Sequence, residues 1–254
     1  PDADPESWDV RVYAISPGSA NFLRAIGAWQ HLAPDRVAAI EAMDVAGDAG
    51  GRLQFSAYDL GERALAWIVE ERALRAALLQ SAFAAGVAVH GGTPFVGLYF
   101  GAERGTLALD DGGEPRELAA RLVVGADGLR SWVREAAGIL AEPRPYGQVG
   151  VVANYECERA HHGIARQWFR ADGSILAWLP LPGRRISIVW SAPQALADEL
   201  RGQPAEALTE RVAEAGGHAL GALREITPSA GFPLQIMRLP SVVGHRLALV
   251  GDAA

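Results

Sequence analysis

The sequence contains no lysine and a single cysteine, Cys157, among its 254 residues. All 23 basic residues are arginines, and 30 acidic residues bring the net charge to −7, which argues against a nucleic-acid-binding surface. One cysteine excludes a disulfide framework and a thiolate metal cluster, so we expect a buried, unreactive thiol. The pair His161-His162 lacks a third ligand at a useful spacing. We therefore predict no metal site and expect this pair to be exposed at a turn.

Long apolar runs are also missing. No segment approaches the ~20 residues that a membrane-spanning helix needs, and the first residues lack the pattern of a signal peptide. Half of the residues are apolar, and the length suits one large domain or two ordinary ones. We therefore expect a globular, cytoplasmic protein, with Pro1 to Glu6 as a flexible lead-in.

A glycine-rich phosphate-binding turn is the third absence. Such a turn has the spacing G-x-G-x-x-G and lies between a buried strand and an amphipathic helix. Gly47 to Gly51 has neither element beside it, and Gly216-Gly217 lies in a polar, helical neighbourhood. The sequence therefore predicts no dinucleotide-binding turn of this kind.

The most informative stretch runs from Leu122 to Arg134. Its apolar start, Leu122 to Val124, predicts a short buried strand. Gly125 and Gly128 permit a tight turn, and Asp127 can accept hydrogen bonds from the N–H groups that open the next helix. Such a strand–turn–helix presents a carboxylate and free N–H groups to a polyol or phosphate. An ordinary strand-to-helix connection explains the same spacing equally well.

A second acid–glycine turn ends the sequence. The apolar strand Leu247 to Val250 runs into Gly251-Asp252, and small residues follow. A repeat of the same arrangement favours a ligand-binding role for both turns.

The two turns together resemble those of the FAD-dependent aromatic hydroxylases, a superfamily of flavoprotein monooxygenases. That family has an internal Asp-Gly motif and a later Gly-Asp motif, and both contact FAD. The segments 8–16, 67–74 and 179–185 are similar in particular to the ubiquinone-biosynthesis hydroxylases. The resemblance covers nearly the whole chain in the family's order. The family's phosphate-binding turn and its glycine-rich segment after Gly-Asp are not present, so the sequence reads as the middle of a longer enzyme.

The resemblance implies FAD as cofactor, NAD(P)H as reductant, dioxygen as co-substrate and an aromatic polyprenyl phenol as the substrate that is hydroxylated. It implies that Asp252 binds a ribityl hydroxyl, that Gly251 allows close approach, and that Asp127 and Gly128 support the pyrophosphate. Because the chemistry belongs to the flavin, we expect no catalytic acid–base pair.

Two arginines are further cofactor candidates by the same resemblance. Arg11 is a candidate for a phosphate contact, and its alternative is an exposed pair with Asp9. Arg72 is the weaker candidate, and its alternative is a solvated arginine in the first turn of a helix. Arg130 and Arg134 either add positive charge near the cofactor or lie on a helix surface.

The expected fold is mixed α/β, as in the p-hydroxybenzoate hydroxylase-like flavoproteins. We expect a partial, Rossmann-like FAD-binding domain over residues 1–140, a substrate domain with an antiparallel sheet over 141–240, and a return strand over 241–254. Glu142 to Pro145 marks the boundary. Alternating apolar residues from Gln148 to Ser191 predict the antiparallel sheet, with one broad apolar face that suits substrate contact or plain core packing.

Other expected elements follow from periodicity and caps. Ser16 and Pro17 predict a helix start, and the helix has Phe22, Leu23 and Ile26 on its apolar face. A second helix is expected over 72–85, with Leu74, Leu78 and Phe83 inward. Further expectations are strands at 87–90 and 229–239, a hairpin over 95–109, and helices over 195–201 and 204–215.

Two other functions remain open. One is a different flavin oxidoreductase, such as a lipid-chain reductase or a halogenase. The other is a non-catalytic binding or assembly module in a ubiquinone-making complex. Peripheral contact with the inner membrane also stays open, because ubiquinone precursors have lipid tails. A sheet without its first strand would expose apolar surface, so we predict a homodimer or a rearranged sheet edge.

Overall fold

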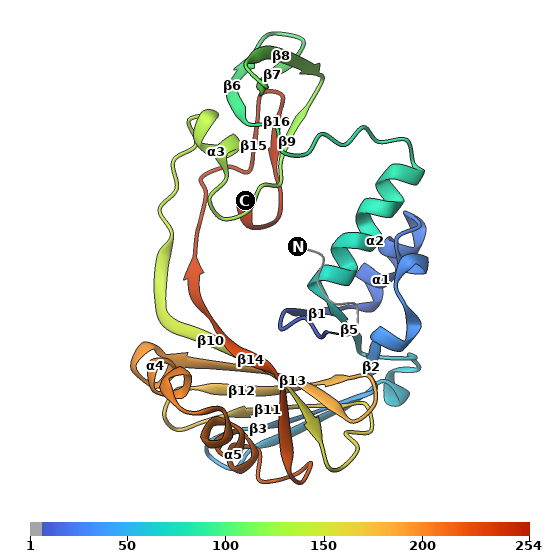
Figure 1. Cartoon of the computed structure of the whole chain (residues 1–254), viewed down its shortest axis with the longest axis vertical. Helices are drawn as coiled ribbons and strands as arrows, with labels where there is room; N and C mark the ends of the chain where they lie inside the picture. Colours follow the sequence, from blue (N-terminus) through green and yellow to red (C-terminus); the bar gives the residue numbers. More distant parts are fainter. Residues whose placement is uncertain (1–6) are drawn as a thin grey trace. The chain divides into compact units, whose positions relative to one another are not determined.

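The computed structural model describes residues 7–254, without the side chains of residues 111, 114 and 115. The expected lead-in, Pro1 to Glu6, therefore lies outside the described residues. The chain forms two compact units (Figure 1). Unit 1 joins the residues up to Val87 with Gly147–Leu234, and unit 2 joins Ala88–Tyr146 with Gln235–Ala254. This grouping differs from the expected one, in which residues 1–140 form one domain. The division into cofactor and substrate domains stays a prediction.

Unit 1 contains a small antiparallel sheet of three strands in the order β1-β5-β2, with two helices. Its elements are β1 (Val12–Ile15), α1 (Pro17–Ala25), the 3-10 turns η1 (Trp29–His31) and η2 (Pro34–Arg36), β2 (Ala38–Ile40), β5 (Ala66–Glu70) and α2 (Glu71–Ala84). The predicted start of α1 is confirmed, because the Ser16 hydroxyl accepts a hydrogen bond from the Ser19 N–H at 3.2 Å.

The predicted apolar faces of these two helices are correct only in part. Leu23 is buried as expected, but Phe22 is 63% exposed and Phe83 is 57% exposed. Ala20 and Ala77 make the innermost helix contacts instead. Small side chains let the helices lie close to the sheet, and this leaves the larger neighbours at the rim.

Unit 1 also contains a sheet of seven strands in the order β14-β10-β13-β12-β11-β3-β4. Its elements are β3 (Ala42–Ala46), β4 (Arg52–Ser56) with the turn η3 (Tyr58–Leu60), β10 (Arg144–Cys157), β11 (Ile164–Phe169), β12 (Ile175–Leu181), β13 (Arg185–Pro193), α4 (Gln194–Gly202), α5 (Ala205–Ala215) and β14 (Leu223–Ile236). The antiparallel sheet expected from Gln148 to Ser191 is confirmed, because β10, β13, β12 and β11 pair antiparallel, and β3 then joins β11 in parallel. The strand expected at 229–239 begins earlier, at Leu223.

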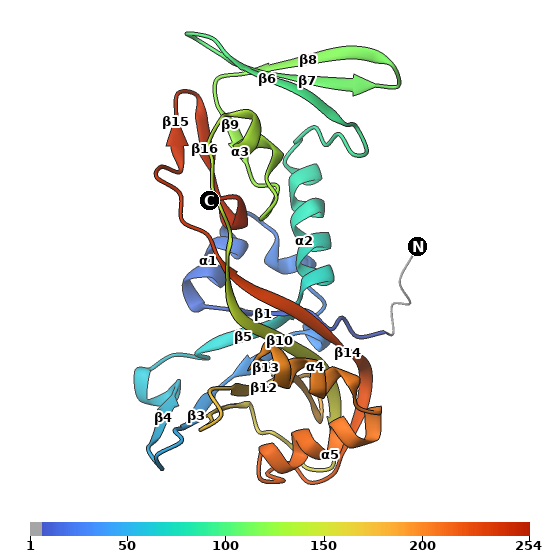
Figure 2. The same ribbon diagram turned by 90° about the vertical axis from the view of Figure 1, so that its left-hand side faces the viewer.

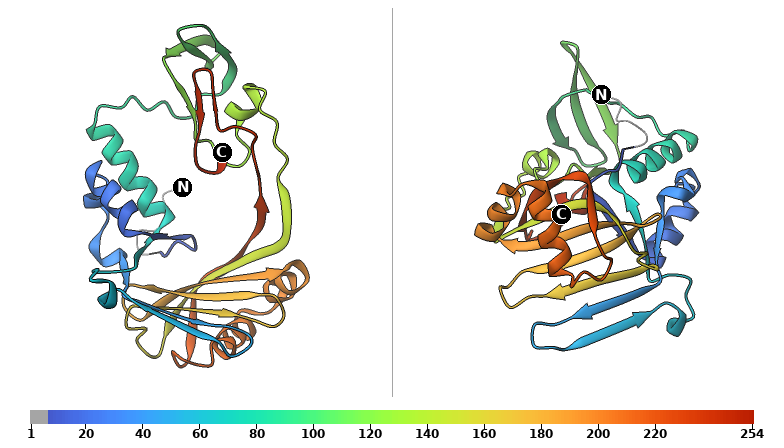
Figure 3. Two further views of the ribbon diagram at one scale, coloured as in Figure 1. Left: turned by 180° about the vertical axis from the view of Figure 1, so that it is seen from behind. Right: turned by 60° about the horizontal axis from the view of Figure 1, so that its bottom comes forward.

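One face of this large sheet is covered by α4 and α5 (Figure 3, right). The predicted alternation is confirmed, since Val149, Val151, Ala153 and Tyr155 are all buried in the core beneath the helices. Cys157 lies in the same core as a free thiol. The expected exposure of the histidine pair is wrong for His161. Its imidazole is 9% exposed and its Nε2 lies 2.8 Å from the Leu181 carbonyl oxygen.

Unit 2 has two further three-stranded sheets (Figure 2). Its elements are β6 (Phe95–Phe100), β7 (Gly105–Asp111), β8 (Glu114–Ala120), β9 (Val123–Gly125), α3 (Trp132–Ala136), β15 (Val243–Gly244), β16 (Leu247–Leu249) and the 3-10 turn η4 (Gly251–Ala253). The predicted hairpin is confirmed as β6 and β7, and β8 adds a third strand. The strand expected at 87–90 is absent from the described structure, where Val87 and Val89 are about half exposed.

None of the helices that the structure describes has the length and apolar character needed to cross a bilayer.

Candidate functional site

The two acid–glycine turns lie side by side in unit 2. Strands β9 and β16 pair in parallel, with Leu247 opposite Val123 and Leu249 opposite Gly125. The Val250 N–H then donates to the Gly125 carbonyl oxygen at 2.9 Å, which extends the pairing to the point where both strands end. Ligands of open α/β sheets bind at the carboxyl ends of parallel strands. The structure therefore brings the two motifs to the kind of edge that binds ligands (Figure 1).

Gly125 is required by close packing rather than by its backbone angle. A Cβ atom there would lie 2.7 Å from the Leu249 side chain and 3.0 Å from Val133, closer than real Cβ contacts. The sequence predicted that β9 is buried, but one of its faces is not. On that face Leu122 is 52% exposed and Val124 is 50% exposed. The covered face of β9 is that of Val123, which packs against the cluster of Val133, Leu247 and Leu249.

Asp127 directs its carboxylate into its own loop. Its Oδ1 accepts a hydrogen bond from the Ser131 hydroxyl at 2.5 Å, and its Oδ2 accepts one from the Val133 N–H at 3.1 Å. Partial burial alone would raise the pKa of Asp127, but these hydrogen bonds outweigh it and hold the pKa below its usual range. Ser131 in turn caps α3, because its hydroxyl accepts from the Arg134 N–H at 3.0 Å. Asp127 therefore holds the loop and the start of α3 in place.

Asp252 is arranged differently. Its side chain is exposed, and within residues 7–254 it takes part in no described hydrogen bond or ion pair. Gly251 and Gly128 have positive φ angles of 60° and 84°, and no atom lies within 4 Å of the position of an added Cβ at either glycine. The edge thus offers one unengaged carboxylate and two stretches of backbone that a ligand can approach closely.

Arg134 joins the two turns, a role that its local sequence does not indicate. Its side chain is 3% exposed. Nη1 donates to the Ala253 carbonyl oxygen at 3.2 Å, and Nη2 donates to the Leu129 carbonyl oxygen at 2.9 Å. The interpretation as a helix-surface arginine is therefore wrong. The sequence around Arg134 carries no signal of this burial, because the Ala253 carbonyl that its guanidinium contacts lies 119 residues away.

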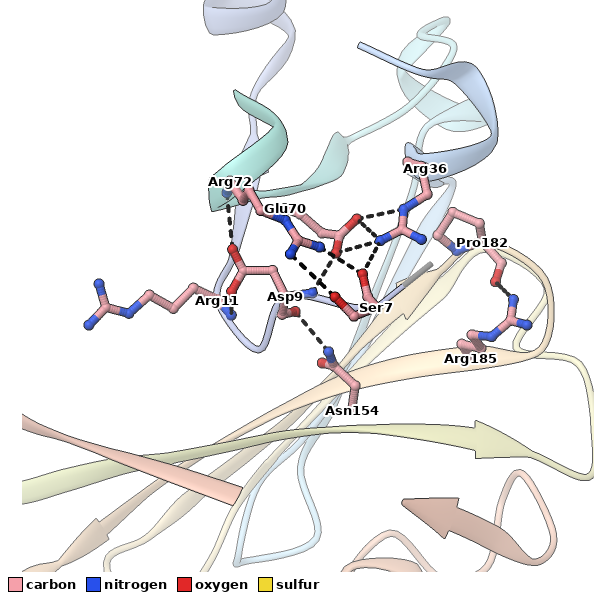
Figure 4. Close-up of polar contacts among 9 residues, drawn as sticks. All are labelled: Ser7, Asp9, Arg11, Arg36, Glu70, Arg72, Asn154, Pro182 and Arg185. Carbon is pink, nitrogen blue, oxygen red and sulfur yellow. Dashed lines mark hydrogen bonds and ion pairs between the residues drawn. The ribbon is translucent and has the colours of Figure 1, made fainter. Parts of the chain in front are cut away.

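The other two candidates, Arg11 and Arg72, lie in unit 1 around Asp9 (Figure 4). The Asp9 carboxylate accepts from the backbone N–H of Arg11 and from that of Arg72, both at 3.0 Å. The Asp9 carbonyl oxygen accepts from the Asn154 side chain at 2.8 Å, which ties this loop to the large sheet. Asp9 therefore occupies the N-terminus of α2, where an anion would otherwise bind.

The two guanidinium groups have different surroundings. The Arg72 guanidinium donates to the Ser7 carbonyl oxygen at 2.7 Å and to the Ser7 hydroxyl at 3.3 Å. The Arg11 guanidinium instead points away from Asp9 (Figure 4) and lies 4.3 Å above the Phe232 ring. The alternative of an Arg11–Asp9 ion pair is thus replaced by a backbone contact. Arg11 is exposed, whereas the Arg72 guanidinium is held by Ser7, and a cofactor contact of either arginine stays a prediction.

A buried ion pair between Glu70 and Arg36 stabilises the loop that contains Asp9. Glu70 is 2% exposed, and its carboxylate accepts two hydrogen bonds from Arg36, from Nε at 2.8 Å and from Nη2 at 2.9 Å. Glu70 also accepts from the Asp9 N–H at 2.6 Å. Two-point pairing of this kind fixes both side chains in one geometry.

Comparison with known proteins identifies relatives of the whole chain. Residues 4–254 match the family model described as an FAD binding domain. The chain is 34% identical over 262 residues to the ubiquinone hydroxylase UbiL of Rhodospirillum rubrum, covering 99% of this chain and 59% of that protein. It is 31% identical to the 3-demethoxyubiquinol 3-hydroxylase of Escherichia coli, covering 97% of this chain and 62% of that protein. The chain thus spans about three fifths of the length of these relatives.

Solved structures agree in fold. PqsL of P. aeruginosa, in complex with 2-aminobenzoylacetate, superposes with a TM-score of 0.76 at 22% identity, covering 96% of this chain and 68% of that chain. The flavin-dependent halogenase CmlS superposes with a TM-score of 0.74 at 18% identity, covering 98% of this chain and 48% of that chain. The mixed α/β fold expected from the sequence is thereby confirmed. The chain belongs to the superfamily of FAD-binding monooxygenases, in the branch of the ubiquinone hydroxylases.

Proposed function

We propose that this chain forms part of an FAD- and NAD(P)H-dependent monooxygenase that hydroxylates the aromatic ring of a polyprenyl phenol in ubiquinone biosynthesis. Two relatives with about 30% identity have names that place them in ubiquinone metabolism. The structural observation that carries the proposal is the parallel pairing of β9 and β16, which sets Asp127-Gly128 beside Gly251-Asp252.

The residues at this edge fit FAD. Asp252 has an exposed, unengaged carboxylate that suits a ribityl hydroxyl, which is a hydrogen-bond donor. At Gly251 and Gly128, no side chain would obstruct the approach of a ligand to the protein backbone. Asp127 serves indirectly, by holding its loop and α3, while Arg134 fixes the spacing of the two turns. Bound FAD would supply the redox chemistry that activates dioxygen.

The large sheet of unit 1 offers a surface for the apolar substrate. On the face away from α4 and α5, Val152, Val189 and Ala177 form a row across β10, β13 and β12. All three side chains are partly exposed, so this apolar row is not closed off by the chain itself. We assign the row to the tail or ring of the polyprenyl phenol, and peripheral membrane contact would follow from the lipid tail.

FAD binding tests the site. Titration of the purified chain with FAD, followed by quenching of flavin fluorescence, should show saturable binding that Asp252→Ala weakens about tenfold, the usual cost of one good hydrogen bond. Asp59→Ala, an exposed aspartate of η3, is the matched control and should leave the affinity unchanged. Equal affinities for the wild type and Asp252→Ala would remove Asp252 from the site.

Turnover tests the reaction. FAD, NAD(P)H and a short-chain polyprenyl phenol should yield a product that is heavier by one oxygen atom, detected by mass spectrometry. Incubation with bromide or chloride tests the halogenase alternative, and a polyisoprenoid alkene tests the lipid-chain reductase. Flavin binding without any of these products would instead support the binding or assembly module.

A further inference from the structure

Unit 1 contains a cavity of about 450 Å³ beside the small sheet, at the end of the layer formed by α1 and η1. It is lined by Arg24, Trp29, Gln30, Leu32, Pro34, Val37, Ala39, Arg63 and Trp67. Two indole rings, two guanidinium groups and one amide thus surround a largely aliphatic floor. The lining therefore combines an aromatic wall with two cationic side chains.

The aromatic wall is held in a fixed geometry. Trp29 and Trp67 meet edge to face, with ring centroids 5.6 Å apart and an interplanar angle of 77°. The Arg24 guanidinium lies 4.6 Å from the Trp29 ring and 5.2 Å from the Trp67 ring. A cation stacked on two aromatic rings keeps its N–H groups at its edge, where they can reach a ligand.

The lining carries two positive charges and no carboxylate. Within the described residues, the Arg24 guanidinium donates one hydrogen bond, from Nη1 to the Asn21 side-chain oxygen at 2.9 Å. In the part of the chain that the structure describes, neither Arg24 nor Arg63 forms an ion pair. The positive charge is therefore not neutralised by a neighbouring acid, and it favours an anionic ligand.

The cavity exists because a small residue faces a large one. Ala39 of β2 is the direct cross-strand partner of Trp67 on β5. Most side chains at position 39 would extend beside the indole ring and fill this space. The alanine leaves one side of Trp67 uncovered, so a planar ring can pack against it.

We propose that this cavity binds a planar aromatic anion, with its ring against Trp29 and Trp67 and its charged group between Arg24 and Arg63. The aromatic wall supplies stacking and apolar contact, and the guanidinium groups supply charge-assisted hydrogen bonds to a carboxylate or similar group.

The test uses 2-naphthoate as the probe and its neutral analogue 2-naphthamide as the ligand control. Isothermal titration calorimetry on the purified chain should show saturable one-to-one binding of naphthoate, and the amide should bind about tenfold more weakly or worse. ¹⁵N-labelled indole groups, assigned with Trp29→Phe and Trp67→Phe, should place the largest shifts on these two of the seven tryptophans.

Five variants, one of them a control outside the cavity, test the elements of the cavity separately. Arg24→Gln and Arg63→Gln should each weaken naphthoate binding about tenfold, because each removes one charged donor. Ala39→Leu should abolish binding by filling the cavity, with Ala39→Val as the milder version if the leucine variant unfolds. Arg75→Gln removes the same charge from an exposed arginine of α2 outside the cavity and should have no effect.

The proposal is overturned if naphthoate does not bind saturably, or if naphthamide binds equally well. It is also overturned if Arg75→Gln weakens binding as much as Arg24→Gln, or if folded Ala39→Leu or Ala39→Val binds like the wild type. Circular dichroism and thermal melting of each variant establish that it is folded.

Discussion

The two aspartates of the acid–glycine turns have different tasks although their local sequences are similar. Asp127 accepts hydrogen bonds from Ser131 and Val133 and so shapes its own loop. Asp252 is exposed and has no described partner within residues 7–254. Substitutions of these aspartates should therefore separate stability from binding: Asp127 should act on folding, and Asp252 on flavin affinity.

Asp127→Ala should lower the free energy of unfolding by about 1 kcal/mol at pH 7, the typical value of a side-chain cap. The pKa of Asp127 is lowered in the folded state, so its stabilising effect is present above the unfolded pKa of about 4 and is lost as the pH falls through the folded pKa. The difference between wild type and variant, measured by urea unfolding, should therefore shrink below about pH 4. Asp48→Ala, at an exposed loop position, is the control. A difference that is the same at pH 7 and pH 3 would contradict the hydrogen-bonding role of the carboxylate.

Cys157 should react very slowly in the folded protein. Burial raises the pKa of its thiol to about 12, so almost no thiolate is present at pH 8. Alkylation by iodoacetamide at pH 8 should be at least about 100-fold slower in buffer than in concentrated urea. Because the sequence has a single cysteine, mass spectrometry of the intact protein reports this site alone. Similar rates in both solutions would place Cys157 outside the core.

Among the secondary-structure elements, α2 shows how a distant side chain completes a helix. Its N-cap residue, Glu70, makes no side-chain capping bond, since its carboxylate binds Arg36 and the Asp9 N–H. Asp9 supplies the acceptor for the Arg72 N–H instead. The start of the helix is therefore satisfied by a loop more than 60 residues earlier in the chain.

Asp9→Ala should destabilise unit 1 by about 1 kcal/mol, because two backbone N–H groups lose their acceptor. Asp9→Asn keeps an acceptor oxygen and should cost less. Hydrogen exchange at the Arg72 amide should accelerate in the alanine variant, while the amides in the middle of α2 change less. Asp35→Ala, at an exposed position in η2, is the matched control. Unchanged exchange at Arg72 would show that water replaces the Asp9 cap without cost.

At the largest scale, exposed apolar side chains gather at an open sheet edge. β4 is the last strand of the seven-stranded sheet as described, and its Leu53 and Phe55 are 62% and 49% exposed. Tyr58 and Leu60 of the following turn are 89% and 67% exposed. An unpaired edge with apolar side chains is prone to self-association. The homodimer expected from the sequence stays a prediction, and β4 is where we place its contact.

Phe55→Lys should reduce this self-association. A lysine on an edge strand opposes pairing with a second strand through charge and desolvation. Light scattering over a concentration series should show a concentration-dependent mass for the wild type and a monomeric mass for the variant. Phe22→Lys, at a phenylalanine on α1 that is 63% exposed, should associate like the wild type. A wild type that is monomeric throughout would exclude the β4 contact.

Local features of this protein follow from its sequence because they depend on near neighbours. Ser16 and Pro17 start a helix through contacts within one turn, and alternation from Val149 to Tyr155 marks a strand with one buried face. The two acid–glycine turns could be recognised in the same way. Each of these features is fixed by backbone hydrogen bonds or by a period of a few residues.

The sequence by itself determined the helix starts, the apolar alternation and the two turns, all of which arise within a few residues. Only the tertiary structure decided that β9 and β16 pair in parallel, that Arg134 reaches a carbonyl group 119 residues away, and that Trp67 faces Ala39. The physical reason is that these partners depend on chain closure and close packing between distant segments. Such contacts leave no periodic signal in either segment. For this reason the sequence is compatible with Arg134 on a helix surface, although the structure buries its guanidinium.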